Sequence, residues 1–153
     1  MYTKEEASAV RQKFWTGFGR YMQPVPSASG EKINWVNYKT GIKGISFKMN
    51  ADNNRAMLAV EISTADEEVR MKYFGIFLNF KKAFEQAAGK DWDFTENFAT
   101  ENGLAISRIS TELNGINIFR ESDWPQIISF LKKNMIALDG FWNEYQHAFD
   151  LVI

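Results

Sequence analysis

Basic and aromatic side chains alternate through the segment from Lys32 to Arg55. This combination binds single-stranded nucleic acid, because cations neutralise the phosphates and exposed rings stack on the bases. We therefore predict a nucleic-acid-binding surface here, provided that its cations share one exposed face with an accessible ring. The residues concerned are Trp35, Tyr38, Lys39, Lys43, Lys48 and Arg55. The alternative is that the aromatic rings belong to the core and the lysines protect exposed strands from aggregation.

Two carboxylates offer a different chemistry, that of a divalent metal ion. Asp52 precedes a predicted strand, and Glu61 lies within that strand two positions before Ser63. The predicted order of elements is a helix, three strands, a helix and a strand. In that order the pair resembles the metal ligands of PD-(D/E)XK nucleases, although Ser63 stands where that motif has lysine. The resemblance implies a degenerate metal-dependent nuclease, with Asp52 and Glu61 as its metal site, as the alternative function. In the simpler interpretation Glu61 is an exposed strand residue that pairs with a lysine such as Lys48.

The sequence lacks the residues and motifs that most other kinds of catalytic site require. The chain contains no cysteine, which excludes disulfides, thiolate nucleophiles and cysteine-bound metals. His147 is the only histidine and no G-x-S-x-G motif accompanies it, which disfavours a Ser-His-Asp triad. Gly41 and Gly44 lack the lysine and the helix of a phosphate-binding loop. We expect no cofactor and favour a protein that is not an enzyme.

Three amphipathic helices are expected to support these residues. Thr3 and Glu6 form a capping box before a helix over residues 4–22. Thr64 and Glu67 form a second box before a long helix that ends at Gly89. The last helix begins near residue 123 and continues through most of the remaining chain. The middle helix should bury three phenylalanines of its apolar stripe, namely Phe77, Phe80 and Phe84.

Six strands are predicted between the helices from alternating apolar residues and turn signals. Short connections favour an antiparallel meander for the first three, and Asn114-Gly115 is a strong signal for a C-terminal hairpin. The predicted order is α-β-β-β-α-β-β-β-α, an α+β fold with the three helices on one side of the sheet. The strands lie at Ile33–Tyr38, Ile45–Met49, Arg55–Ser63, near residues 92–94, at Ala105–Leu113 and at Ile116–Phe119.

Composition indicates one globular domain over residues 1–153. The chain is 45% hydrophobic, which is apolar enough to offset the chain entropy lost on folding. Net charge is only −1, but residues 1–60 hold nine basic and four acidic side chains, whereas the remainder is acidic. No apolar run reaches the roughly 18 residues of a membrane span, and we expect a bacterial, cytoplasmic protein without membrane contact.

Self-association through the last helix is a further expectation. Phe130, Ile136 and Phe141 lie outside the main apolar stripe of that helix and would need cover from a second copy. We therefore predict a homo-oligomer that uses this helix.

Short stretches distributed over nearly the whole chain resemble the bacterial domain-of-unknown-function family 4268. They are Phe14-Trp15, residues 27–41, Ile106–Ile109 and Trp124-Pro125. The resemblance implies a stand-alone protein or a module behind nuclease-like regions, and it brings no catalytic residues. Together with the residues above, it favours a non-catalytic interaction module with an unknown protein partner, accessory to a nucleic-acid-processing system.

Overall fold

The computed structural model describes residues 2–152 and contains four α-helices, two short 3-10 helices and four strands within that range. The elements are α1 (Lys4–Met22), β1 (Ile45–Ala51), β2 (Arg55–Ile62), α2 (Glu67–Asn79), α3 (Lys81–Ala88), β3 (Asp93–Ala99), β4 (Ala105–Asn114), η1 (Glu121–Asp123), α4 (Trp124–Tyr145) and η2 (Gln146–Val152). The prediction of an α+β fold is confirmed, although the number and order of the elements differ from the prediction.

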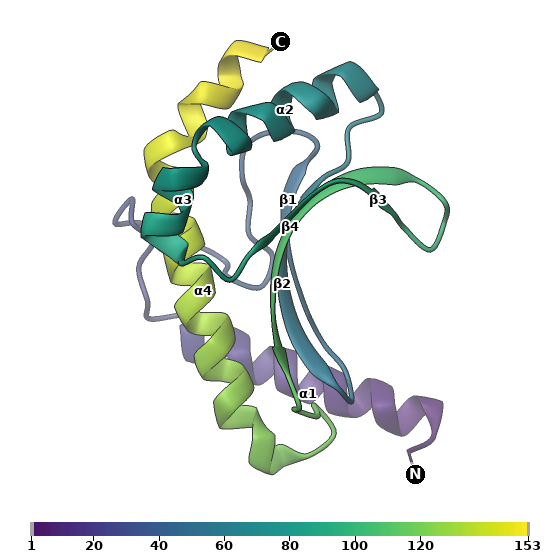
Figure 1. Ribbon diagram of the computed structural model, residues 1–153. Helices are drawn as coiled ribbons and strands as arrows, with labels where there is room; N and C mark the ends of the chain where they lie inside the picture. The colour runs from purple at the N-terminus through teal and green to yellow at the C-terminus, as the bar shows by residue number, and fades with distance from the viewer. Residues whose placement is uncertain (1, 153) are drawn as a thin grey trace.

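All four strands form one antiparallel sheet in the order β1-β2-β4-β3. Because side chains alternate across a strand, one face carries Phe47, Val60 and Ile109 in a row of register partners, and these three are buried. Helices α2, α3 and α4 lie on this side of the sheet, and the opposite side is concave and uncovered (Figure 1). The hydrophobic core is therefore one continuous cluster between the sheet and the helices.

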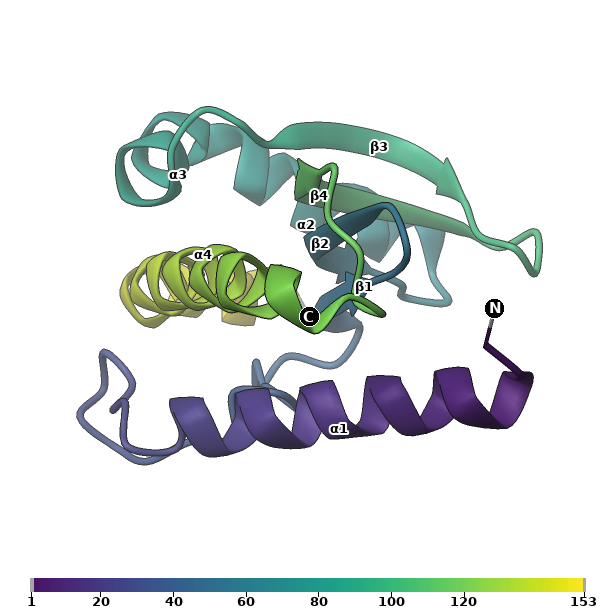
Figure 2. The ribbon, with the colours of Figure 1, turned by 90° about the horizontal axis from the view of Figure 1, so that it is seen from below.

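Helix α1 lies beyond the β1 edge of the sheet, on the other side of α4 from α2 and α3 (Figure 2). Its predicted capping box is confirmed, because Glu6 N–H donates to the Thr3 hydroxyl and Thr3 N–H donates to the Glu6 carboxylate. Phe14, Phe18 and Met22 are buried, which fixes one face of α1 against the core. The opposite face of α1 remains exposed.

The predicted long helix from Thr64 to Gly89 is two helices. Its N-cap is Asp66, whose carboxylate accepts from the backbone of Glu68 and Val69, while the Thr64 hydroxyl donates to the Asp66 carbonyl instead. Phe80, with φ −97° and ψ 15°, interrupts the helical backbone between α2 and α3. Phe77 and Phe84 are fully buried as predicted, but Phe80 lies at this break and is only half-buried, with its ring centre 4.8 Å from that of Tyr145.

Two predicted strands are absent. The segment Ile33–Tyr38 is irregular, because Trp35 and Tyr38 hydrogen-bond to the backbone and side chains of other segments. Asn114-Gly115 does not turn a hairpin into Ile116–Phe119. Instead β4 continues to Asn114 and pairs with both β2 and β3, and the Gly115 and Ile118 N–H groups donate to Asn54 and Asp52 carbonyls at the β1–β2 turn.

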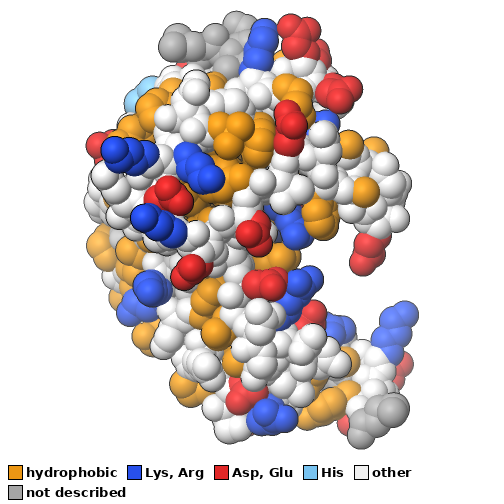
Figure 3. Space-filling view, viewed as in Figure 1, with side chains coloured by type: hydrophobic (Ala, Val, Ile, Leu, Met, Phe, Trp, Pro, Cys, Tyr) orange, Lys and Arg blue, Asp and Glu red, His pale blue; other side chains and the backbone are white. Residues whose placement is uncertain are grey.

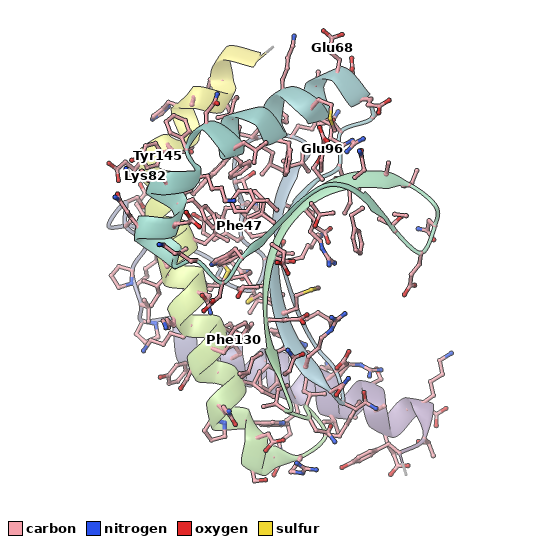
Figure 4. The ribbon with its side chains drawn as sticks, in the orientation of Figure 1. Phe47, Glu68, Lys82, Glu96, Phe130 and Tyr145 are labelled. Carbon is pink, nitrogen blue, oxygen red and sulfur yellow. The ribbon has the colours of Figure 1, made fainter. Side chains whose placement is uncertain are left out.

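Of the three residues of the last helix that were expected to need cover from a second copy, only Phe141 is fully buried within the chain. Phe141 is 1% exposed and stacks on Phe77, and Phe130 is half-buried on the side of α4 that faces the sheet (Figure 4). Ile136 alone is exposed, at 39%. The argument for self-association through α4 therefore loses Phe141, and an oligomer remains only a proposal.

None of the described helices combines the length and the apolar character that crossing a membrane requires.

Candidate binding site

Residues 23–44 connect α1 to β1 without a helix or a strand. Irregular connections longer than about 12–15 residues are uncommon in compact folds, and those that are ordered are usually functional. Figure 2 shows this connection, which we call the long loop, passing around the end of α1 and alongside α4. Its fixed shape requires specific contacts, because it has no ladder of backbone hydrogen bonds.

A buried carboxylate on α4 supplies those contacts. Asp139 is 1% exposed and accepts four hydrogen bonds within this region. The Ser27 hydroxyl donates at 2.9 Å, the Ala28 N–H at 2.7 Å, the Tyr38 hydroxyl at 2.6 Å and the Asn143 amide at 2.9 Å. No lysine or arginine forms an ion pair with it among the described residues. Neutral donors from both ends of the long loop thus converge on one charge, and this ties the loop to α4.

Aromatic packing holds the second half of the long loop. Phe47 points from β1 into the interior (Figure 4), where its ring lies 4.7 Å from that of Tyr38 and 5.7 Å from that of Trp142. The Trp142 indole donates to the Thr40 carbonyl at 2.9 Å, and the Trp35 indole donates to the Val25 carbonyl at 3.0 Å. The loop is therefore a rigid wall beside α4.

Between this wall and α4 lies a cavity of about 510 Å³, which we call the loop pocket. Binding sites for small ligands commonly measure about 300–1,000 Å³. Polar side chains dominate the lining, with Tyr38, Ile33 and Trp142 as its apolar part. Lys32 and Lys39 supply positive charge, and Glu31 is the one acidic side chain in the lining. The other lining residues are Ser27, Ser29, Asn34, Asn37, Asn143 and Gln146.

Tyr38 connects the loop pocket to the buried carboxylate, and this makes a prediction for alkaline pH. Burial first, and then the hydrogen bond to Asp139, raise the pKa of the Tyr38 hydroxyl above its ordinary value of about 10. A raised pKa in the folded state contributes stability that is fully present below about pH 10 and is lost as the pH rises further. We expect Tyr38→Phe to make the free energy of unfolding less dependent on pH above about 10. Denaturant unfolding of both proteins across this range measures the effect, and identical pH dependence would contradict it.

The six residues of the predicted nucleic-acid surface do not lie together. Tyr38 and Lys39 line the loop pocket, whereas the Trp35 ring is 2% exposed and contributes to the core. Lys48 and Arg55 project from the uncovered face of the sheet, where Arg55 pairs with Glu112 at 2.7 Å. Lys43 is exposed on the final turn of the long loop, and next to it Gly44 closely approaches the side chain of Thr64.

Asp52 and Glu61 lie at opposite ends of the β1–β2 hairpin. Asp52 caps the turn by accepting from the backbone N–H groups of Asn54 and Arg55, while Glu61 pairs in register with Ser46 at the far end. The five residue steps from Ala56 to Glu61 separate the backbones of the two residues by about 17 Å, which is further than their side chains can bridge. One metal ion cannot contact both. Among the residues that the structure describes, no group of three or more His, Cys, Asp or Glu side chains could hold a metal ion.

The uncovered face of the sheet forms a hollow between the β3–β4 hairpin and α1, and Figure 3 shows basic and acidic side chains together in it. The register places Arg108 beside Glu61, and the Arg108 guanidinium lies 3.7 Å from the centre of the Phe98 ring. Positive charges here have acidic neighbours, so this surface is a weaker anion site than the loop pocket.

The fold and the loop pocket define an α+β protein in which helices cover one face of an antiparallel sheet and an ordered loop forms a polar cavity. The chain belongs to the domain-of-unknown-function family DUF4268, whose model matches residues 10–146. Both sides of the loop pocket lie within the matched range. No curated protein and no solved structure matches the chain significantly.

Sequence reasoning did not identify Asp139 or Ser27 as parts of a site. A signal for Asp139 was present, because it lies between Leu138 and Trp142 on the apolar stripe of the last helix, where a lone acid needs partners. Ser27 carries no such signal, since a serine in a loop is ordinary.

Proposed function

We propose that the protein is a non-catalytic binding module that takes an anionic ligand of nucleotide size into the loop pocket. The main support is the loop pocket of about 510 Å³. Its wall, the long loop, is already held in place by hydrogen bonds to the buried Asp139 carboxylate. A wall that is already ordered reduces the entropy lost on binding.

The lining matches the parts of a nucleotide. Lys32 and Lys39 are exposed at the pocket and take part in none of the ion pairs among the described residues, so both are free to contact a phosphate. Asn34, Asn37 and Gln146 offer amides that can hydrogen-bond to the edge of a base. Tyr38 and Ile33 provide apolar surface for the sugar or the base.

The hydroxyl groups at the pocket support binding rather than catalysis. Ser27 and Tyr38 both donate to Asp139, so their protons are held by a buried carboxylate, and no histidine lines the cavity. A nucleophilic role would require a base that removes a proton from the hydroxyl, whereas here the hydroxyls hold the loop.

A nucleic-acid context is part of the proposal. All the lysines of the pocket come from the basic first part of the chain, and the family resemblance implies modules that accompany nuclease-like regions. The module would then recognise a nucleotide unit for a separate nucleic-acid-processing protein.

Adenosine monophosphate is the first probe of this proposal. We expect the unmodified protein to bind it in isothermal titration calorimetry, and Lys39→Ala to weaken binding by at least about fivefold, the effect of losing about 1 kcal/mol. Lys90→Ala serves as a matched control, because Lys90 is an exposed lysine that does not line the loop pocket. Absence of binding, or equal losses for the two variants, would overturn the proposal.

A further inference from the structure

The loop pocket is one of three depressions that share residues along one side of the molecule. A second depression lies between α1 and the long loop and shares Lys32, Ile33 and Asn34 with the loop pocket. A third lies on the exposed face of α1 beside Trp124, and it shares Thr16 and Arg20 with the second. We call this continuous series the α1 groove.

Positive charge predominates along the α1 groove. Lys13, Arg20, Lys32 and Lys39 lie in its lining, against a single carboxylate, Glu31. Lys13 pairs with Glu121 at 2.8 Å, but both side chains of that pair are exposed and exchange partners at low cost. Arg20, Lys32 and Lys39 take part in none of the ion pairs among the described residues.

The cations are spread along the groove rather than gathered at one point. The part of the groove on α1 runs from Ala9 to Gln23, which is about 21 Å at the rise of an α-helix. A mononucleotide would occupy the loop pocket and leave Arg20 and Lys13 unused. A ligand with charges repeated along its length would engage all four.

We propose that the α1 groove binds a single strand of nucleic acid, one nucleotide of which enters the loop pocket. This inference rests on the proposed function. It extends that function from a nucleotide-sized ligand to a strand, whose repeated phosphates match the spaced cations. The groove also contains the amide side chains of Gln12, Gln23 and Asn34, which can hydrogen-bond to the edges of bases. An acidic peptide would supply negative charge but no bases, so we favour a nucleic-acid strand.

Gly17 permits a direct test, because it lines the groove on α1 and a Cβ atom placed there meets nothing within 4 Å. Glutamate and lysine both have a higher helix propensity than glycine, so neither substitution should impair folding. With a labelled single strand of about ten nucleotides, at about 50 mM salt, we expect Gly17→Glu to weaken binding at least about fivefold. Gly17→Lys should strengthen it. Fluorescence anisotropy measures both effects, with DNA and RNA strands of the same sequence as separate arms.

Gly75→Glu on α2 is the matched control, since Gly75 is also helical, has open space and lies outside the groove. The inference is supported if the DNA strand or the RNA strand binds, with weaker binding by Gly17→Glu, stronger binding by Gly17→Lys and unchanged binding by Gly75→Glu. The inference is overturned if the unmodified protein and Gly17→Glu bind the strand with equal affinity. It is also overturned if polyglutamate displaces the labelled strand as effectively as the unlabelled strand does.

Adenosine monophosphate separates the two proposals. Gly17→Glu should leave binding of the mononucleotide unchanged, because Gly17 does not line the loop pocket. Binding of the mononucleotide without binding of either strand overturns the α1 groove and leaves the proposed function standing. Binding of a strand that responds to Gly17, without binding of the mononucleotide, supports the groove and overturns the loop pocket as a nucleotide site.

Discussion

Replacing Asp139 by alanine is expected to lower the free energy of unfolding by about 3–5 kcal/mol. The carboxylate is buried and accepts hydrogen bonds from Ser27, Ala28, Tyr38 and Asn143. Its removal leaves the buried Ser27 hydroxyl and three partly buried donors without their acceptor and opens a void, and both effects destabilise the folded state. Urea unfolding followed by tryptophan fluorescence measures the loss.

Two milder variants make this prediction specific. Asp139→Asn keeps the shape but offers a single acceptor oxygen, so its loss should be smaller than that of Asp139→Ala. Ser27→Ala removes one of the four donors to Asp139, together with the weaker bonds that this hydroxyl accepts from Ser29 and Asn143, and should cost about 1–2 kcal/mol. In Asp139→Ala, amide hydrogen exchange should accelerate in residues 27–40 more than in the sheet. Unchanged stability, or uniform acceleration throughout the protein, would show that Asp139 does not hold the long loop.

Replacing Arg70 by methionine is expected to cost about 3–5 kcal/mol as well. Arg70 is a 2% exposed residue of α2 that reaches the irregular part of β3, where the register shifts between Thr95 and Phe98. Its guanidinium donates to the Glu96 carbonyl at 2.8 Å, the Ser107 hydroxyl at 2.9 Å and the Asn97 amide oxygen at 3.0 Å. The bulge leaves the Glu96 carbonyl outside the sheet ladder, and Arg70 and the Ser107 hydroxyl donate to it instead.

Lys72→Met on the same helix is the control for Arg70. Lys72 pairs with Glu68 at 3.5 Å, but both side chains are exposed, so the loss should be within about 0.5 kcal/mol. Thermal unfolding of the two variants under one set of conditions compares them. Losses of similar size would mean that the buried contacts of Arg70 contribute no more than an exposed ion pair.

Local signals predicted the elements whose stability is mostly local. The capping box of Thr3 and Glu6 and the apolar stripe that follows placed the first helix correctly. Alternation in Ile45–Met49 and Arg55–Ser63 located the β1–β2 hairpin and its buried face. These patterns act over a few residues, and tertiary contacts reinforce them.

Tertiary contacts overrode the local signals elsewhere. Ile33–Tyr38 has the composition of a strand, but Trp35 bonds to Val25 within the long loop, while Tyr38 and the Thr40 carbonyl bond to Asp139 and Trp142 of α4, and the chain follows those contacts. Asn114-Gly115 has the composition of a tight hairpin turn. It is used instead for a connection, because β4 already has a partner on each side.

The candidate site could be predicted only in part for the same reason. Lys32, Tyr38 and Lys39 belong to the segment whose alternating basic and aromatic side chains predicted a binding surface. Asp139 and Trp142 come from a helix about 100 residues further along the chain, and their proximity to Tyr38 follows from the fold. Lys13 and Arg20 appear in the sequence as ordinary polar positions on the first helix, and only the path of the long loop beside α1 makes them part of one groove.

The most direct test of the loop pocket is a titration of the isotopically labelled protein with adenosine monophosphate, followed by amide chemical shifts. We predict shifts concentrated in residues 29–39 and 142–146, the two sides of the cavity, with little change in β1 and β2. The same titration of Lys39→Ala should require a higher nucleotide concentration for equal shifts. Shifts centred on Lys48 and Arg55 at the uncovered face of the sheet, or none at all, would contradict the assignment of the loop pocket as the binding site.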